Sequence, residues 1–175
     1  MRAILLLACL FPAAPVARAA DWYGEFHVGT TRGTDAFATE RVEGAYGLGI
    51  GVEFNRWFST QLDWHTLGEN PGIHSCPIIC ATPSPLPEHG YALRALPRLP
   101  IGDSFALELG LGLMKWEGDY NLIGVPVEAN GTDPWYSVGA AWRFDERWSI
   151  TVEMQVLELE GMDFDWTGAT LRYRF

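Results

Sequence analysis

Lysine is almost absent from this sequence, in which Lys115 is the only one among 175 residues. The 22 acidic residues outnumber the 12 Lys and Arg, so the formal net charge is -10 at pH 7. Proteins that bind nucleic acid neutralise its phosphates with clustered Lys and Arg. This charge balance excludes nucleic acid as an expected partner.

The N-terminal apolar run, Ala3 to Phe11, is much shorter than the roughly 20 residues that a membrane-spanning helix needs. Arg2 precedes this run, and the small-residue pattern Ala17-Arg18-Ala19 follows it. This arrangement is typical of a secretory signal peptide. We predict a signal peptide over residues 1–19, cleaved after Ala19, and a single domain over residues 20–175.

Cysteine is scarce as well. The stretch Leu6 to Cys9 resembles a lipoprotein cleavage box, but few apolar residues precede Cys9, so the downstream cleavage site is favoured. The other two cysteines, Cys76 and Cys80, lie in the proline-rich stretch HSCPIICATPSPLPEHG. In an exported protein this favours a local disulfide over a free or metal-binding pair. A C-x3-C pair with one nearby His is not a recognisable zinc spacing.

No segment after the signal peptide has a convincing helical period. Apolar residues instead alternate with other residues at period two, as in YGLGIGVEF, in runs of about ten residues. The predicted strands are 22–30, 46–54, 58–66, 91–99, 105–113, 136–144, 148–156 and 167–175.

The connections between these strands alternate in length. Short links are expected at 55–56, 100–104 and 145–147, and long links at 31–44, 67–89, 117–133 and 158–165. Short turns at one end and long connections at the other predict an up-and-down meander whose two ends face different surroundings.

One face of the predicted strands combines recurring glycines with charged residues. A narrow barrel interior suits both, because small residues relieve crowding and buried charges require partners. A soluble barrel would place its apolar face inward, but this charged face is too small and too rich in glycine to coat an exterior. We therefore predict a network of charges in the lumen, formed by Glu25, Glu53, Asp63, Glu108, Glu153, Arg94, Arg98, Arg143, Arg172 and Arg174.

The opposite face carries Leu, Ile, Val and Ala in mid-strand and aromatic residues toward the strand ends. Such a face suits lipid, with aromatic girdles at both interfaces. Phe54, Phe58, Phe105, Phe144, Trp148 and Phe175 are expected near the short turns, and Tyr46, Trp64, Tyr91 and Tyr136 near the long connections.

A sheet in lipid must close, because no backbone group can be left unpaired. The sequence therefore predicts an all-β fold, an eight-stranded antiparallel up-and-down transmembrane β-barrel in a bacterial outer membrane. We expect periplasmic termini, extracellular long loops, a monomeric state, and contact with outer-membrane lipids and lipopolysaccharide.

The segments GLGIGVEFNRWFSTQLDW, LPIGDSFALELGLGLMKW, WRFDERWSITVEMQ and LRYRF resemble the OmpA-like transmembrane barrels of Gram-negative bacteria. The resemblance covers the whole chain after the signal peptide. It implies short periplasmic turns, outward loops and a lumen filled by charged side chains. Larger members of that family continue into a peptidoglycan-binding domain, whereas this sequence ends at Phe175, so tethering to the cell wall is not expected. Tyr173 and Phe175 resemble the terminal signal that the barrel-assembly machinery recognises.

Motifs for catalysis or metal binding are weak. Asp63 and His65 share the inward face and could form a general-base pair, but no recognisable serine motif accompanies them. His74-Ser75 does not match the His-x-Ser pattern of lipid A deacylases. The carboxylates of residues 158–165 lack the spacing of an EF-hand loop. We predict no catalytic residue, no metal site and no cofactor.

These observations favour a structural or surface-interaction role for the barrel. Two alternatives stay open. One is a narrow channel for ions or small solutes, which would require the lumen charges to rearrange. The other is an enzyme that modifies lipid A.

Overall fold

The computed structural model describes residues 20–34, 40–68, 87–122, 125–159 and 162–175. These residues form eight strands in chain order. The strands are β1 (Asp21–Thr34), β2 (Glu40–Asn55), β3 (Phe58–Thr66), β4 (His89–Ile101), β5 (Phe105–Leu122), β6 (Val125–Arg143), β7 (Trp148–Leu159) and β8 (Met162–Arg174).

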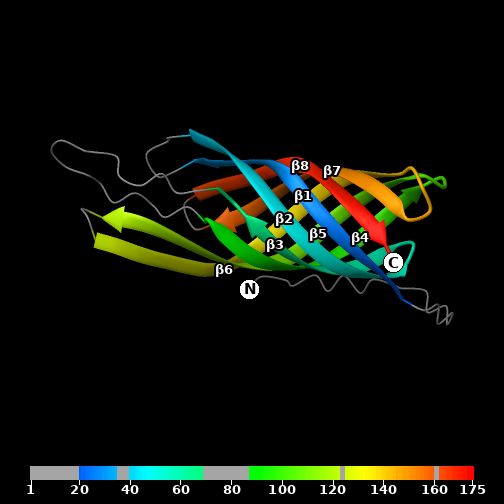
Figure 1. Cartoon of the computed structure of the whole chain (residues 1–175), viewed down its shortest axis with the longest axis horizontal. Coiled ribbons are helices and arrows are strands. Elements are labelled where there is room, and N and C mark those ends of the chain that lie inside the picture. The colour runs from blue at the N-terminus through cyan, green and yellow to red at the C-terminus, as the bar shows by residue number, and fades with distance from the viewer. Residues whose placement is uncertain (1–19, 35–39, 69–86, 123–124, 160–161) are drawn as a thin grey trace, which may run out of the picture.

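Each strand pairs antiparallel with the next one, and β8 pairs with β1 to close the barrel. Figure 1 shows the strands wound obliquely around one axis, with the chain's C-terminus at the same end as the turns that join β2 to β3, β4 to β5 and β6 to β7. The predicted eight-stranded antiparallel barrel is confirmed. No helix in the described part of the chain is long and apolar enough to cross a membrane.

The strands are longer than predicted at the end away from the short turns, so three of the four expected long connections are mostly strand. β5 and β6, for example, remain paired as far as Leu122 and Val125. The predicted strands ended where the outward-facing residues were no longer apolar. The backbone ladder does not need apolar side chains, and Lys115 pairs with Thr132 beyond that point, with both side chains exposed. The segments concerned are 31–44, 117–133 and 158–165.

The two faces of the barrel wall are inverted relative to a soluble protein. Leu93 and Leu113 face each other across β4 and β5 on the outside, with 65 % and 57 % of their surfaces exposed. Arg94 and Glu108, on the alternate face of the same two strands, are buried in the lumen. The predicted orientation of both faces is therefore confirmed, and a wall with this apolar exterior requires lipid around it.

Aromatic rings lie toward both ends of the outer surface. Phe54 and Phe58 stack beside the β2–β3 turn, with ring centroids 5.9 Å apart. At the other end of this hairpin, Tyr46 and Trp64 pack edge to face at 6.1 Å. Aromatic rings at both limits of an apolar band are typical of the two membrane interfaces.

The barrel interior is divided into a polar part and an apolar part. Toward the long connections it is filled by a buried apolar cluster, although the period-two pattern predicts a charged and glycine-rich interior. Toward the short turns it holds charged and polar side chains. The apolar cluster consists of Leu67, Ala92, Met114, Trp116, Trp135, Leu157 and Phe164.

Candidate functional site

Nine of the ten charged residues predicted for the lumen form ion pairs there, in two groups that Gln61 bridges by donating to Glu25 of one group and Asp63 of the other. They come from all strands except β6, because each strand places alternate side chains inward. The carboxylates are Glu25, Glu53, Asp63, Glu108 and Glu153, and the guanidinium groups are those of Arg94, Arg98, Arg172 and Arg174.

Two arginines connect strands that are not neighbours in the sheet. Arg94 of β4 donates from Nε to Asp63 Oδ2 at 2.7 Å and from Nη1 to Glu153 Oε2 of β7 at 3.3 Å. Arg172 of β8 bonds Glu25 of β1 and donates two hydrogen bonds of 3.2 Å to Glu108 of β5. These guanidinium groups therefore form struts across the lumen.

Closer to the short turns, Glu53 accepts hydrogen bonds from two arginines. Arg98 Nη1 lies 3.1 Å from Glu53 Oε2, and Arg174 Nη2 lies 2.8 Å from the same oxygen. Arg98 Nη2 also lies 2.8 Å from Glu108 Oε1, which links this group to the Arg172 strut. Buried charges of both signs are thereby held in mutual contact, as burial requires.

Arg143, the tenth predicted residue, does not join the network. It is the last residue of β6, where the barrel wall ends, so its side chain is exposed. Together with Arg56 it lines a cavity of about 160 Å³ at the short-turn end of the lumen.

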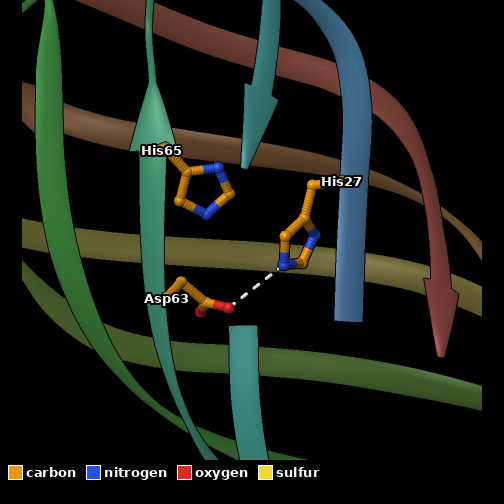
Figure 2. Close-up of side chains that lie close together, drawn as sticks. All are labelled: His27, Asp63 and His65. Atoms are coloured by element: carbon orange, nitrogen blue, oxygen red, sulfur yellow. Dashed lines mark hydrogen bonds and ion pairs between the residues drawn. The ribbon is translucent and has the colours of Figure 1, made fainter. Parts of the chain in front are cut away.

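Two buried histidines lie at the middle of the lumen beside the charged network. The sequence suggested a pair between Asp63 and His65, which are two residues apart on β3. In the structure Asp63 instead bonds His27 of β1, with 3.1 Å between Asp63 Oδ1 and His27 Nε2. Figure 2 shows the three side chains pointing toward one another from β1 and β3. The alternation that places Glu25 inward also places His27 inward, two residues further along β1, but nothing in the sequence near His27 identifies its partner.

β2 lies between β1, which carries His27, and β3, which carries Asp63 and His65. The glycines of β2 have no side chains, so the side chains of β1 and β3 can meet over them. Gly47 pairs with both His27 and His65, and Gly49 pairs with both Glu25 and Asp63. A Cβ atom at Gly49 would lie 2.5 Å from Asp63 Oδ1 and 3.2 Å from His27 Nε2. The inward-facing glycines of GLGIG are thus needed for the contact between His27 and Asp63 across β2.

Two tryptophans, Trp135 of the apolar cluster and Trp166, pack against the histidines. The ring of Trp135 lies 5.1 Å from that of His65, and the ring of Trp166 lies 6.4 Å from that of His27. Both indole rings are almost fully buried. The predicted strands began just after these residues, although Trp135 and Trp166 keep the inward register of Ser137 and Gly168, so the same alternation extended by one step identifies them.

The remaining site predictions concern the cysteines and the C-terminal residues. Cys76 and Cys80 lie outside the described residues. Phe175 is 75 % exposed, and its ring packs edge to face on that of Tyr173 at 5.6 Å. Arg147 Nη1 donates to the Tyr173 hydroxyl at 3.2 Å. The role of these two aromatics in assembly stays a prediction.

A closed barrel with an apolar exterior and a lumen of paired charges defines an integral membrane protein of the bacterial outer-membrane type. The chain matches the outer membrane protein beta-barrel domain family over residues 3–175 and belongs to that family. No curated protein matches the chain.

Several solved structures share the fold. Neisserial surface protein A is 10 % identical, with a TM-score of 0.65 over 88 % of this chain and 97 % of that one. Ail, the attachment invasion locus protein of Yersinia pestis, is 14 % identical, with a TM-score of 0.64 over 89 % and 99 %. The N-terminal barrel domain of Pseudomonas aeruginosa OprF is also 14 % identical, with a TM-score of 0.62 over 89 % and 99 %.

Proposed function

We propose that this barrel is closed to ions and solutes and has a structural or surface-interaction role, with periplasmic termini and extracellular long connections. The observation that supports closure is the pair of arginine struts. Arg94 and Arg172 each join strands from different sides of the lumen.

Closure follows from the energetics of these buried pairs. An ion that crossed the lumen would have to separate a guanidinium from its carboxylates, and removing one partner of a buried pair costs about 3–5 kcal/mol. Beyond the charges it would meet the apolar cluster around Trp116 and Trp135. An eight-stranded barrel has an interior just wide enough for its own side chains.

The surface role draws support from the proteins that share the fold. Ail is named for attachment and invasion, and one of its structures is a complex with the heparin analogue sucrose octasulfate. A sulfated partner is not expected here, because among the residues whose exposure is described near the long-connection end, exposed Glu117, Glu128 and Glu158 outnumber Arg32 and Lys115. We expect a neutral or cationic partner.

Within the membrane we expect a monomer surrounded by outer-membrane lipids and lipopolysaccharide. The exposed apolar band and the aromatic residues at its limits fit lipid contact on every strand.

An enzymatic role has less support. No serine among the described residues hydrogen-bonds to His27 or His65, and both rings are buried beneath tryptophans. Mass spectrometry of lipid A from cells with and without the protein tests this directly. We expect the same acyl pattern, and an altered pattern would contradict the proposal.

Planar-bilayer recordings test closure. We expect the wild-type barrel to be silent and Arg172→Ala, which removes one strut, to raise the conductance. Arg143→Ala is the matched control, because Arg143 lies outside the network, and it should stay silent. Stepwise conductance by the wild-type barrel would overturn the proposal.

A further inference from the structure

His27, Asp63 and His65 form a compact group of metal-ligating side chains in the lumen. One ligand atom from each lies within 4.8 Å of the others, and all three side chains are buried. The prediction of no metal site rested on spacing along the chain. This group is assembled across β2 from residues 36 and 38 positions apart, so no linear motif describes it.

The hydrogen bonds of His27 determine which of its nitrogens carries hydrogen. Thr170 donates its only hydroxyl hydrogen to Glu153 Oε1 at 2.6 Å. Thr170 Oγ1 therefore accepts the 2.7 Å bond from His27 Nδ1, which must carry a hydrogen. In a neutral imidazole the other nitrogen is then a bare acceptor. This second nitrogen, Nε2, faces Asp63 Oδ1 at 3.1 Å.

Two facing acceptors at this distance require a cation between them, either a proton or a metal ion. The surroundings of His27 strengthen this requirement. Asp63, Glu25 and Glu153 place carboxylate oxygens 3.1 Å, 3.6 Å and 3.6 Å from its ring nitrogens. In the described network the five carboxylates outnumber the four guanidinium groups by one.

His65 distinguishes between the two cations. Its imidazole is fully buried, and neither of its ring nitrogens has a hydrogen-bond partner among the described residues. A buried polar group without a partner is costly and calls for an explanation. A proton shared by His27 and Asp63 leaves His65 unpartnered, whereas a metal ion takes a lone pair from each of the three side chains.

We propose that His27 Nε2, Asp63 Oδ1 and a ring nitrogen of His65 bind a divalent transition-metal ion, with Zn²⁺ as the reference case. Imidazole nitrogen suits zinc and its neighbours, whereas Mg²⁺ and Ca²⁺ prefer oxygen ligands. Asp63 keeps Arg94 on its other oxygen, Oδ2, and Gln61 also donates to Oδ1.

The site needs only a small adjustment to close around the ion. Zinc–ligand bonds of about 2.0–2.2 Å place neighbouring tetrahedral ligand atoms about 3.3 Å apart, which the His27–Asp63 distance of 3.1 Å already approaches. The 4.8 Å limit of the group leaves about 1.5 Å for His65 to move. Thr170 and Glu153 would orient His27 as outer partners of a metal-bound imidazole.

The test measures metal retained by the folded barrel. The chain without its signal peptide and without a histidine tag is refolded from urea into detergent with excess ZnCl₂, freed of unbound metal by gel filtration, and assayed by elemental mass spectrometry. We expect one zinc per chain, and loss of that zinc in His65→Ala. His89→Ala should retain it, because His89 is exposed on β4 beside Glu117.

Three further measurements guard against misfolding of His65→Ala and against zinc binding by the cysteines. His65→Gln, which keeps a polar side chain of similar size, should also lose the zinc. Cys76→Ser/Cys80→Ser should retain it, and Co²⁺ in the wild-type barrel should give visible bands without thiolate charge transfer. A zinc-free wild type, equal zinc in His65→Ala, or thiolate bands with Co²⁺ would each overturn the proposal.

Discussion

Gly49 of β2 lies opposite Asp63 in the β2–β3 ladder, and a methyl group at Gly49 would reach within 2.5 Å of Asp63 Oδ1. The same methyl group would lie 3.2 Å from His27 Nε2. Absence of a side chain at this position is therefore what allows His27 of β1 to reach a residue of β3 across the intervening strand.

Gly49→Ala should destabilise the barrel by about 1–3 kcal/mol, as overpacking of a filled interior does. Gly44→Ala is the matched control in the same strand, because a Cβ there would meet nothing within 4 Å. Urea unfolding in detergent, followed by tryptophan fluorescence, measures both. Equal stability of the two variants would show that the lumen has room at Gly49.

Arg94→Ala should destabilise the barrel by about 3–5 kcal/mol, because it leaves two buried carboxylates without their guanidinium partner. Lys115→Ala removes a surface ion pair with Glu117 at 3.3 Å and should cost less than about 1 kcal/mol. The same unfolding measurement compares the two substitutions. A difference that vanishes in high salt would mean that water reaches the Arg94 pairs.

Deletion of Phe175 should lower the yield of barrel in the outer membrane without lowering the stability of the barrel that does insert. Its ring is 75 % exposed and contacts Tyr173 at the edge of the wall, so little folded-state packing is lost. Phe144→Ala, at another exposed aromatic, is the control. Quantification of folded protein in membrane fractions checks the prediction, and an unchanged yield for the deletion would contradict an assembly signal.

Cys76 and Cys80 should be oxidised to a local disulfide in the exported protein. Iodoacetamide should then label neither thiol until a reductant is added, after which two labels are expected, because the predicted cleavage after Ala19 would remove Cys9. Intact-mass spectrometry reads both the labels and the start of the chain, which we expect at Ala20. Two labels before reduction would contradict the disulfide.

The orientation of each side chain was predictable because lipid imposes a rule on every residue of a spanning strand. Leu93 faces out and Arg94 faces in, and the period-two alternation alone predicts both orientations. The alternation does not predict which inward-facing residues contact one another. Asp63 contacts His27 and Arg94 because of the stagger of the closed sheet, and that stagger is set by the sum of all registers and is not encoded near any one residue.

The limits of the strands were less predictable for a related reason. Where lipid ends, the outward residues no longer need to be apolar, so the period-two signal fades while the hydrogen-bonded ladder continues. Lys115 opposite Thr132 is such a place. The inward face kept its register there, as Trp135 shows, but Trp135 lies one residue before the predicted strand 136–144 and so was not assigned to the lumen.

The unequal strand lengths give the barrel an uneven rim. β3 has 9 residues, whereas β5 and β6 have 18 and 19. Figure 1 shows the β5–β6 hairpin projecting well beyond the neighbouring strands. A surface carried on paired strands loses its backbone freedom when the barrel folds, so a partner that docks there does not have to order it. The β5–β6 hairpin is thus a rigid projection that holds its residues in a fixed position for any partner that approaches that side of the barrel.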